Sequence, residues 1–211
     1  MGQATGLALA TLAAMTASGL LYQLGKRHQW YQRHTLLVLK GGTTLLAALL
    51  ALWGAIVYAS PAAWWLFAGL LLCALADVVL ELHFHGGMLV FALGHLAYIA
   101  AFLTRQSVEL LNLAIWAVLL AAVLAGGWAL RGRLEQPVVP ILLYASLISA
   151  MLALALTQPL AAAIGAVMFV ISDGLIAYRL AFQAGRLNDD LCMLLYYGGQ
   201  YLLALSALAG Q

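Results

Sequence analysis

Two aspartates lie inside apolar stretches of this 211-residue chain: Asp77 in the segment CALADVVLEL and Asp173 in the segment FVISDGLIAYRL. A charged carboxylate at the centre of a membrane helix costs at least ~2.5 kcal/mol, so such residues usually face a protein interior or a water-filled cavity and carry a function. Two carboxyl groups in different environments can serve as the acid and the base of one reaction. These two residues are therefore the first candidates for proton-transfer chemistry.

The composition indicates that the elements positioning these aspartates lie in a membrane. The chain is 66% hydrophobic and 8% charged, with a mean hydropathy of +1.03, whereas soluble domains carry about 25% charged residues. A membrane-spanning helix needs about 20 apolar residues, which leaves room for about eight spans with short loops and none for a soluble domain. We predict an all-α, polytopic integral membrane protein, with residues 1–211 forming a single eight-helix domain. No basic stripe suited to nucleic acid is present.

Apolar runs and helix-breaking residues set the bounds of the predicted spans. Prolines near three of the starts fit the first positions of a helix, and Gly86–Gly87 and Gly185 fall at or between span ends. The first run lacks a basic leader, so it is read as a membrane helix and not as a cleaved signal peptide. The predicted spans are 3–24, 35–58, 62–82, 87–103, 108–130, 138–156, 159–181 and 189–209.

The distribution of Lys and Arg predicts the orientation. Arg105 alone lies in a loop on one side, and seven others lie in or beside loops on the other side. Because cytoplasmic loops carry an excess of Lys and Arg, we predict a multi-pass inner-membrane protein with both termini outside the cytoplasm. The seven residues are Lys26, Arg27, Arg33, Arg131, Arg133, Arg179 and Arg186.

The two aspartates also hint at an internal duplication. Asp77 lies in the third predicted span and Asp173 in the seventh, and each follows a small residue, Ala76 or Ser172. A parallel repeat of four plus four helices would place them in equivalent positions, as parallel repeats do in some transporters.

Other polar residues inside the spans fall in the same, cytoplasmic half. With a rise of 1.5 Å per residue, Asp77 lies ~8 Å from the end of its span, and His95 and Asp173 lie ~12 Å from theirs. We therefore predict one polar cavity, open toward the cytoplasmic leaflet, with the two aspartates as catalytic residues. The predicted substrate-binding residues are Lys40, Glu81, His95, Tyr98, Ser172, Tyr178, Tyr196, Tyr197 and Gln200.

Each of these residues also has a purely structural interpretation. Lys40 could extend to the membrane surface as an anchor, and Ser172 could bond its own helix backbone. The tyrosines could be packing residues, and His83 and His85 could be solvated. Cys73 and Cys192 are interpreted as packing residues and not as a disulfide, because free cysteine is often simply buried. Asp77 and Asp173 could likewise form a structural pair with Lys40.

Several short segments together resemble the YhhN family, whose animal members are the TMEM86 lysoplasmalogenases. The resemblance implies an eight-helix membrane fold and hydrolysis of the vinyl ether bond of lysoplasmalogens, giving a fatty aldehyde and a glycerophospho-ethanolamine or -choline. It also implies a lysophospholipid substrate in a lipid bilayer, and it assigns Asp77 and Asp173 to the family's acidic motif positions. Ala76 departs from the family, in which Gly or Ser is common there. The segments are Lys40 with Gly41, ADVVLE at 76–81, GMLVFALGHLAY at 87–98, SDGLIAY at 172–178 and YYGGQY at 196–201.

The implied chemistry suits the residues. Vinyl ether hydrolysis begins with proton delivery to an alkene carbon and passes through an oxocarbenium ion. Burial in a low dielectric favours the protonated form of a carboxyl group, and a second, ionised carboxylate can stabilise the cation, as in glycosidases. Lys40 and Arg179 could hold the phosphate. This reaction requires neither a metal nor a cofactor.

Three other functions are kept open. A zinc-dependent lipid hydrolase would take its ligands from His83, His85, His95 and the two aspartates. A small proton-coupled transporter would use intramembrane acids as a relay, although such sites usually lie near the midplane. A structural membrane subunit would tolerate substitution of the aspartates.

Overall fold

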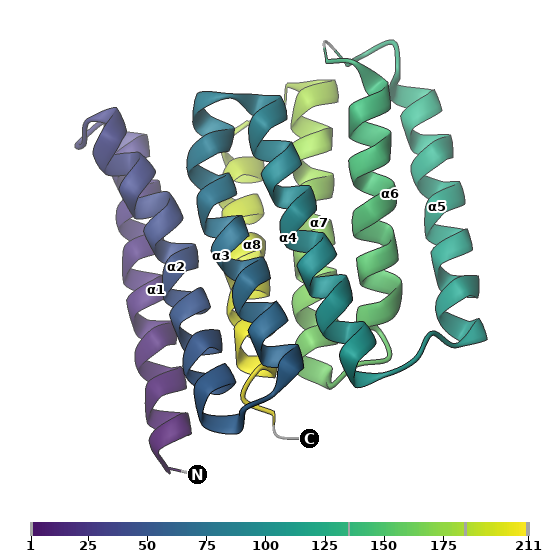
Figure 1. Cartoon of the computed structure of the whole chain (residues 1–211). Helices are drawn as coiled ribbons and strands as arrows, with labels where there is room; N and C mark the ends of the chain where they lie inside the picture. Colours follow the sequence, from purple (N-terminus) through teal and green to yellow (C-terminus); the bar gives the residue numbers. More distant parts are fainter. Residues whose placement is uncertain (1, 135, 184, 210–211) are drawn as a thin grey trace.

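The computed structural model describes residues 2–134, 136–183 and 185–209, and within them eight α-helices form one bundle (Figure 1). This confirms the predicted all-α architecture. The predicted domain 1–211 also includes residues 1, 135, 184, 210 and 211, which lie outside the described residues. The helices are α1 (Gly2–His28), α2 (Arg33–Tyr58), α3 (Pro61–Leu82), α4 (Phe84–Arg105), α5 (Leu110–Leu130), α6 (Val138–Ala155), α7 (Leu160–Phe182) and α8 (Arg186–Ser206).

The helix bounds differ from the predicted spans by a few residues at some ends. Helix α4 begins at Phe84 and not at residue 87, because His83 caps it: its Nδ1 accepts a hydrogen bond from the backbone N–H of Gly86 at 3.0 Å. His95 therefore lies eleven residues from the start of α4, or ~16 Å, which is deeper than predicted. Helix α8 likewise begins three residues earlier, at Arg186.

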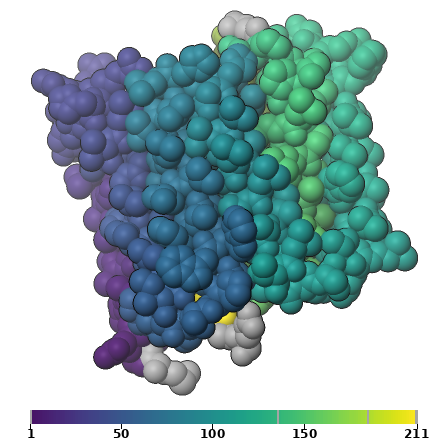
Figure 2. Space-filling view, in the orientation of Figure 1, coloured from purple at the N-terminus to yellow at the C-terminus, as the bar shows by residue number. Residues whose placement is uncertain are grey.

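Among the described residues, the seven helices α1 to α7 are long and apolar enough to cross a membrane. Helix α8 is less apolar, and its position explains why. It packs on α7, α2, α3 and α1, and in the space-filling view of Figure 2 only a small patch in the yellow of the C-terminal residues is visible. Its polar residues Tyr196 and Gln200 are buried against protein and not against lipid, so this helix tolerates a lower hydropathy.

The helix contacts follow the pattern that a four-plus-four repeat predicts. In the first half α1 packs on α2, α2 on α3 and α3 on α4; in the second half α5 packs on α6, α6 on α7 and α7 on α8. Two of the contacts between the halves are also related by the repeat: α4 packs on α6, and α8 packs on α2. Helix α8 in addition contacts α1 and α3. In this pattern α3 and α7, which carry the aspartates, are each the third helix of their half.

Two glycine pairs support the same equivalence. A Cβ atom on Gly69 of α3 would lie 3.0 Å from the carbonyl oxygen of Gly94 of α4, and one on Gly165 of α7 would lie 2.9 Å from that of Gly199 of α8. Each pair lets two backbones approach closely, as small residues do in membrane helices. Gly69 precedes Asp77, and Gly165 precedes Asp173, by the same number of positions along the helix.

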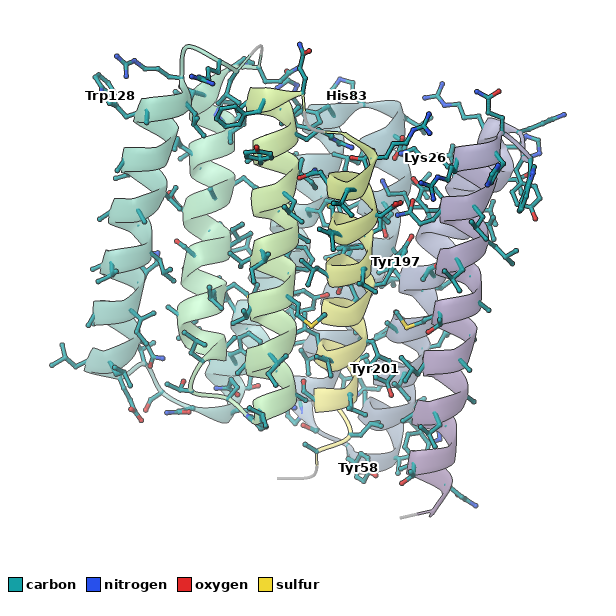
Figure 3. The ribbon with its side chains drawn as sticks, turned by 180° about the vertical axis from the view of Figure 1, so that it is seen from behind. Lys26, Tyr58, His83, Trp128, Tyr197 and Tyr201 are labelled. Atoms are coloured by element: carbon teal, nitrogen blue, oxygen red, sulfur yellow. The ribbon has the colours of Figure 1, made fainter. Side chains whose placement is uncertain are left out.

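The basic residues gather at one end of the bundle. Helices α1, α3, α5 and α7 end there and α2, α4, α6 and α8 begin there, while Arg105 lies at the opposite end with both termini. Figure 3 shows the labelled Lys26, His83 and Trp128 at this end and Tyr58 at the other. We call it the basic end.

Candidate functional site

Both aspartates line one cavity of about 100 Å³ inside the bundle. Asp77 contributes from α3 and Asp173 from α7, and Lys40, Tyr144 and Tyr196 line it from α2, α6 and α8. The rest of the wall is largely apolar, as a site for a hydrocarbon chain requires. The residues that complete it are Leu80, Phe84, Met88, Phe91, Ile141, Ser172, Ile176, Ala177, Leu180, Cys192 and Met193.

Asp77 is almost fully buried, with 1% of its surface exposed. Its Oδ2 accepts hydrogen bonds from the hydroxyl groups of Thr44, at 2.6 Å, and Tyr196, at 2.8 Å. The close approach of α2 to α3 makes this contact, because a Cβ on Gly41 would lie 2.9 Å from the Ala74 carbonyl oxygen. Asp77 is thus held by two hydroxyl donors from two different helices.

Asp173 has a different environment. It is half-buried, and its Oδ2 accepts one hydrogen bond, at 2.6 Å, from the hydroxyl group of Tyr144. The same hydroxyl lies 3.3 Å from Nε2 of His95, which is fully buried on α4. The three side chains form a chain from His95 through Tyr144 to Asp173.

Lys40 does not act as a membrane-surface anchor. Its side chain is 8% exposed, and its Nζ lies 2.7 Å from Oε1 of Glu81, whose side chain is 40% exposed. This ion pair sits where the aspartate cavity meets a second, more polar space of about 140 Å³ that Lys26 and Arg179 also line. We call this second space the vestibule; it lies at the basic end of the bundle.

The vestibule carries charges of both signs. Lys26, Lys40 and Arg179 line it together with Glu81 and Asp189. Arg179 pairs with Asp189, with Nη1 and Oδ1 2.9 Å apart, and Nζ of Lys26 lies 5.9 Å from the ring centre of Tyr22. A zwitterionic group could therefore meet complementary partners here.

The other predicted binding residues divide into three groups. Ser172 lines the cavity, although its hydroxyl donates to the Phe169 carbonyl of its own helix at 2.7 Å. Tyr98 and Gln200 form a fully buried pair, with the tyrosine hydroxyl donating to Oε1 at 2.8 Å, and neither lines the cavity.

The structure does not bring the last two tyrosines to the cavity. Tyr178 is 51% exposed and packs its ring on Phe182, so the predicted binding role has no geometric support. Tyr197 is buried and faces a groove between α1 and α8, and its hydroxyl lies 3.5 Å from the Lys40 carbonyl oxygen.

Two residues that contact the aspartates were not predicted. Thr44 follows Lys40 by one helical turn, and residues four apart on a helix share a face, so the spacing could have identified it. Tyr144 is a single tyrosine in the apolar run of α6, and only the packing of α6 on α4 and α7 shows its role.

The metal-ligand alternative lacks a donor set in this fold. Across residues 2–134, 136–183 and 185–209, no three His, Cys, Asp or Glu side chains come together as metal ligands would. His83 and His85 lie at the basic end with ring centres 6.5 Å apart, and His83 acts as the N-cap of α4.

Comparison with known proteins identifies the family. Lysoplasmalogenase TMEM86B of Mus musculus is 33% identical over 149 residues, which cover 68% of this chain and 64% of the mouse protein. The same-named protein of Rattus norvegicus is 34% identical over 149 residues, covering 62% of its own length. The match thus spans less than two thirds of either relative. No solved structure shows significant similarity to the chain. The YhhN family profile matches residues 35–207, which include every residue that lines the aspartate cavity, and the chain belongs to the YhhN family.

Proposed function

We propose that this protein is a membrane-embedded hydrolase that cleaves the vinyl ether bond of lysoplasmalogen-type lysolipids. The observation that carries the proposal is that two intramembrane carboxyl groups, Asp77 and Asp173, line one largely apolar cavity. The names of the mouse and rat relatives point to the same activity. The products would be a fatty aldehyde and a glycerophospho-ethanolamine or -choline.

The different surroundings of the aspartates suggest different roles. Two hydroxyl donors on Asp77 Oδ2 stabilise its carboxylate form, which suits the group that faces a developing cation. Asp173 has one such donor, so we assign it the role of proton donor. Separate environments for an acid and a carboxylate are typical of oxocarbenium chemistry.

The reaction then proceeds in three steps. Asp173 donates its proton to the outer alkene carbon, and the electron pair of the double bond forms the new C–H bond. The ether oxygen shares a lone pair with the adjacent carbon, which gives an oxocarbenium ion beside the Asp77 carboxylate. Water adds to that carbon, and Asp77 accepts the proton released by the water. The resulting hemiacetal breaks its bond to the glycerol oxygen, which takes that proton from Asp77, while the hemiacetal hydroxyl gives its proton to the Asp173 carboxylate and becomes the aldehyde.

His95 and Tyr144 would act as positioning residues in this scheme. The Tyr144 hydroxyl holds Asp173 at 2.6 Å and contacts His95 Nε2 at 3.3 Å. This chain fixes the carboxyl group of Asp173 in one orientation.

The vestibule supplies the site for the polar head. Its cationic residues Lys26, Lys40 and Arg179 suit a phosphate, and Lys40 borders the aspartate cavity as well. A lysolipid with its phosphate there would place its first chain carbons, which carry the vinyl ether, next to the aspartates. Because the positive-inside rule assigns the basic end to the cytoplasm, we propose that the site faces the cytoplasmic leaflet of the inner membrane.

Mass spectrometry of lysolipids incubated with the purified protein tests this proposal. A mixture of vinyl ether, alkyl ether and acyl lysophospholipids should lose only the vinyl ether species and gain fatty aldehyde. Release of fatty acid from the acyl species, or transport into vesicles without any product, would contradict it.

A further inference from the structure

A hollow larger than the aspartate cavity lies elsewhere in the described part of the molecule. A groove of about 400 Å³ runs between α1 and α8. Figure 3 shows these helices side by side, with Tyr197 and Tyr201 on the side of α8 that faces α1. Its walls are mainly apolar, and its surface faces the position of the bilayer because Leu20 and Leu194 are 57% and 67% exposed.

The dimensions of the groove match one leaflet of a membrane. On α1 it extends from Leu12 to Arg27, a rise of ~22 Å, and one leaflet with its head groups is about 20–22 Å thick. Its charged and amide residues, Gln23, Arg27 and Asp190, lie toward the basic end, where lipid phosphates would lie. A single lipid chain with its phosphate near Arg27 would therefore fit the groove along its length.

The groove borders the site at one side chain. Met193 of α8 lines the groove, the vestibule and the aspartate cavity. Methionine is unbranched and adapts its shape readily, so a change of its rotamer can join or separate these spaces without moving a helix.

We propose that the α1–α8 groove is the lateral access site at which the aliphatic chain of a single-chain phospholipid binds before it passes Met193 into the aspartate cavity. This inference rests on the proposed function for the identity of the lipid. It explains why an intramembrane site with a narrow cavity of about 100 Å³ can receive a substrate that is dissolved in the bilayer.

A photo-crosslinking experiment tests the groove without requiring turnover. The probe is an acyl lysophosphatidylethanolamine with a diazirine at the middle of its chain, added to the protein in phosphatidylcholine nanodiscs. We expect adducts on α1 and α8 at groove residues such as Leu20 and Leu194, and excess unlabelled lysolipid should remove them. Adducts spread evenly over the lipid-facing helices, or confined to α4, α5 and α6, would overturn the proposal.

Filling the groove provides the second measurement. Leu20→Trp places a large ring in the groove, and Leu9→Trp places the same ring on α1 at a residue that is 61% exposed and does not line the groove. Leu20→Trp should remove the groove adducts and raise KM for a long-chain vinyl ether lysolipid about tenfold, the effect of displacing about two methylene groups from an apolar contact, while Leu9→Trp should change neither.

The outcomes separate this inference from the proposed function. Groove adducts with no aldehyde release from any vinyl ether lipid would refute the proposed hydrolysis. They would also refute the identification of the lipid in the groove as a substrate. Aldehyde release that Leu20→Trp leaves unchanged would refute the groove as the access site while the hydrolysis stands.

Discussion

The two aspartates differ in how many hydroxyl donors they have, and this difference predicts an unequal response to removal of a hydroxyl. Tyr144→Phe deletes the donor at 2.6 Å from Asp173 Oδ2 and breaks the link to His95. Thr44→Val deletes a donor at the same distance from Asp77, which keeps the Tyr196 hydroxyl at 2.8 Å. Both substitutions preserve most of the side-chain volume in the bundle.

The magnitude follows from the value of a hydrogen bond to an ionisable group. Such bonds contribute ~1.5–3 kcal/mol, and each 1.36 kcal/mol in a barrier is about a tenfold change in rate. We expect Tyr144→Phe to lower kcat for aldehyde release by about 10-fold to 100-fold. Thr44→Val should cost less than about tenfold, because one donor to Asp77 remains.

The assay is fatty aldehyde release from lysoplasmenyl-ethanolamine in detergent, with thermal melting measured in parallel to confirm folding. The double variant Thr44→Val/Tyr196→Phe removes both hydroxyl donors from Asp77. Its activation barrier for aldehyde release should rise by more than the sum of the increases in the two single variants. The reasoning would be refuted if folded Tyr144→Phe kept the wild-type rate, or if Thr44→Val alone were as slow as Tyr144→Phe.

Three further predictions concern head-group binding, packing and topology. Lys40→Met should raise KM more than it lowers kcat if this lysine holds the phosphate, and Lys26→Met should act in the same direction; a change in kcat alone at Lys40 would contradict the role. Gly165→Ala should lower the melting temperature, because its Cβ would lie 2.9 Å from the Gly199 carbonyl oxygen and 3.0 Å from the Leu203 nitrogen. The control Gly174→Ala, with no atom within 4 Å of the added Cβ, should leave the melting temperature unchanged or raise it, because alanine is favoured over glycine in a helix by about 0.5–1 kcal/mol. A cysteine at Gln3 should react with a membrane-impermeant reagent from outside intact cells and one at Gln29, beside the basic end, only after disruption; the reverse labelling would overturn the predicted orientation.

Much of the fold could be predicted because the membrane imposes strong constraints on sequence. Long apolar runs and flanking prolines located all eight helices, including α8, whose Asp189 and Asp190 lie in its first turns. The errors were at helix ends, where local capping decides: the His83 ring extends α4 by a turn that hydropathy does not show.

The site was partly predictable for a similar reason. Asp77, Asp173 and Lys40 stand out because a charge inside an apolar run is rare, and the structure brings all three to one cavity. Tyr144 and Tyr178 look alike in the sequence, since both are tyrosines in apolar helices, yet one contacts Asp173 and the other is 51% exposed. The difference depends on which face of each helix meets its neighbours, and nearly uniform hydrophobicity hides that face.

Replacement of the two aspartates tests the central claim most directly. Asp77→Asn and Asp173→Asn keep the shape of the side chains and remove their ability to exchange protons. General acid–base catalysis contributes about 10²–10⁴-fold, so each folded variant should lose at least that much aldehyde release, and the double variant should be little worse because the two groups act as one unit. Folded asparagine variants that hydrolyse lysoplasmenyl-ethanolamine at the wild-type rate would contradict the account and remove both aspartates from the mechanism.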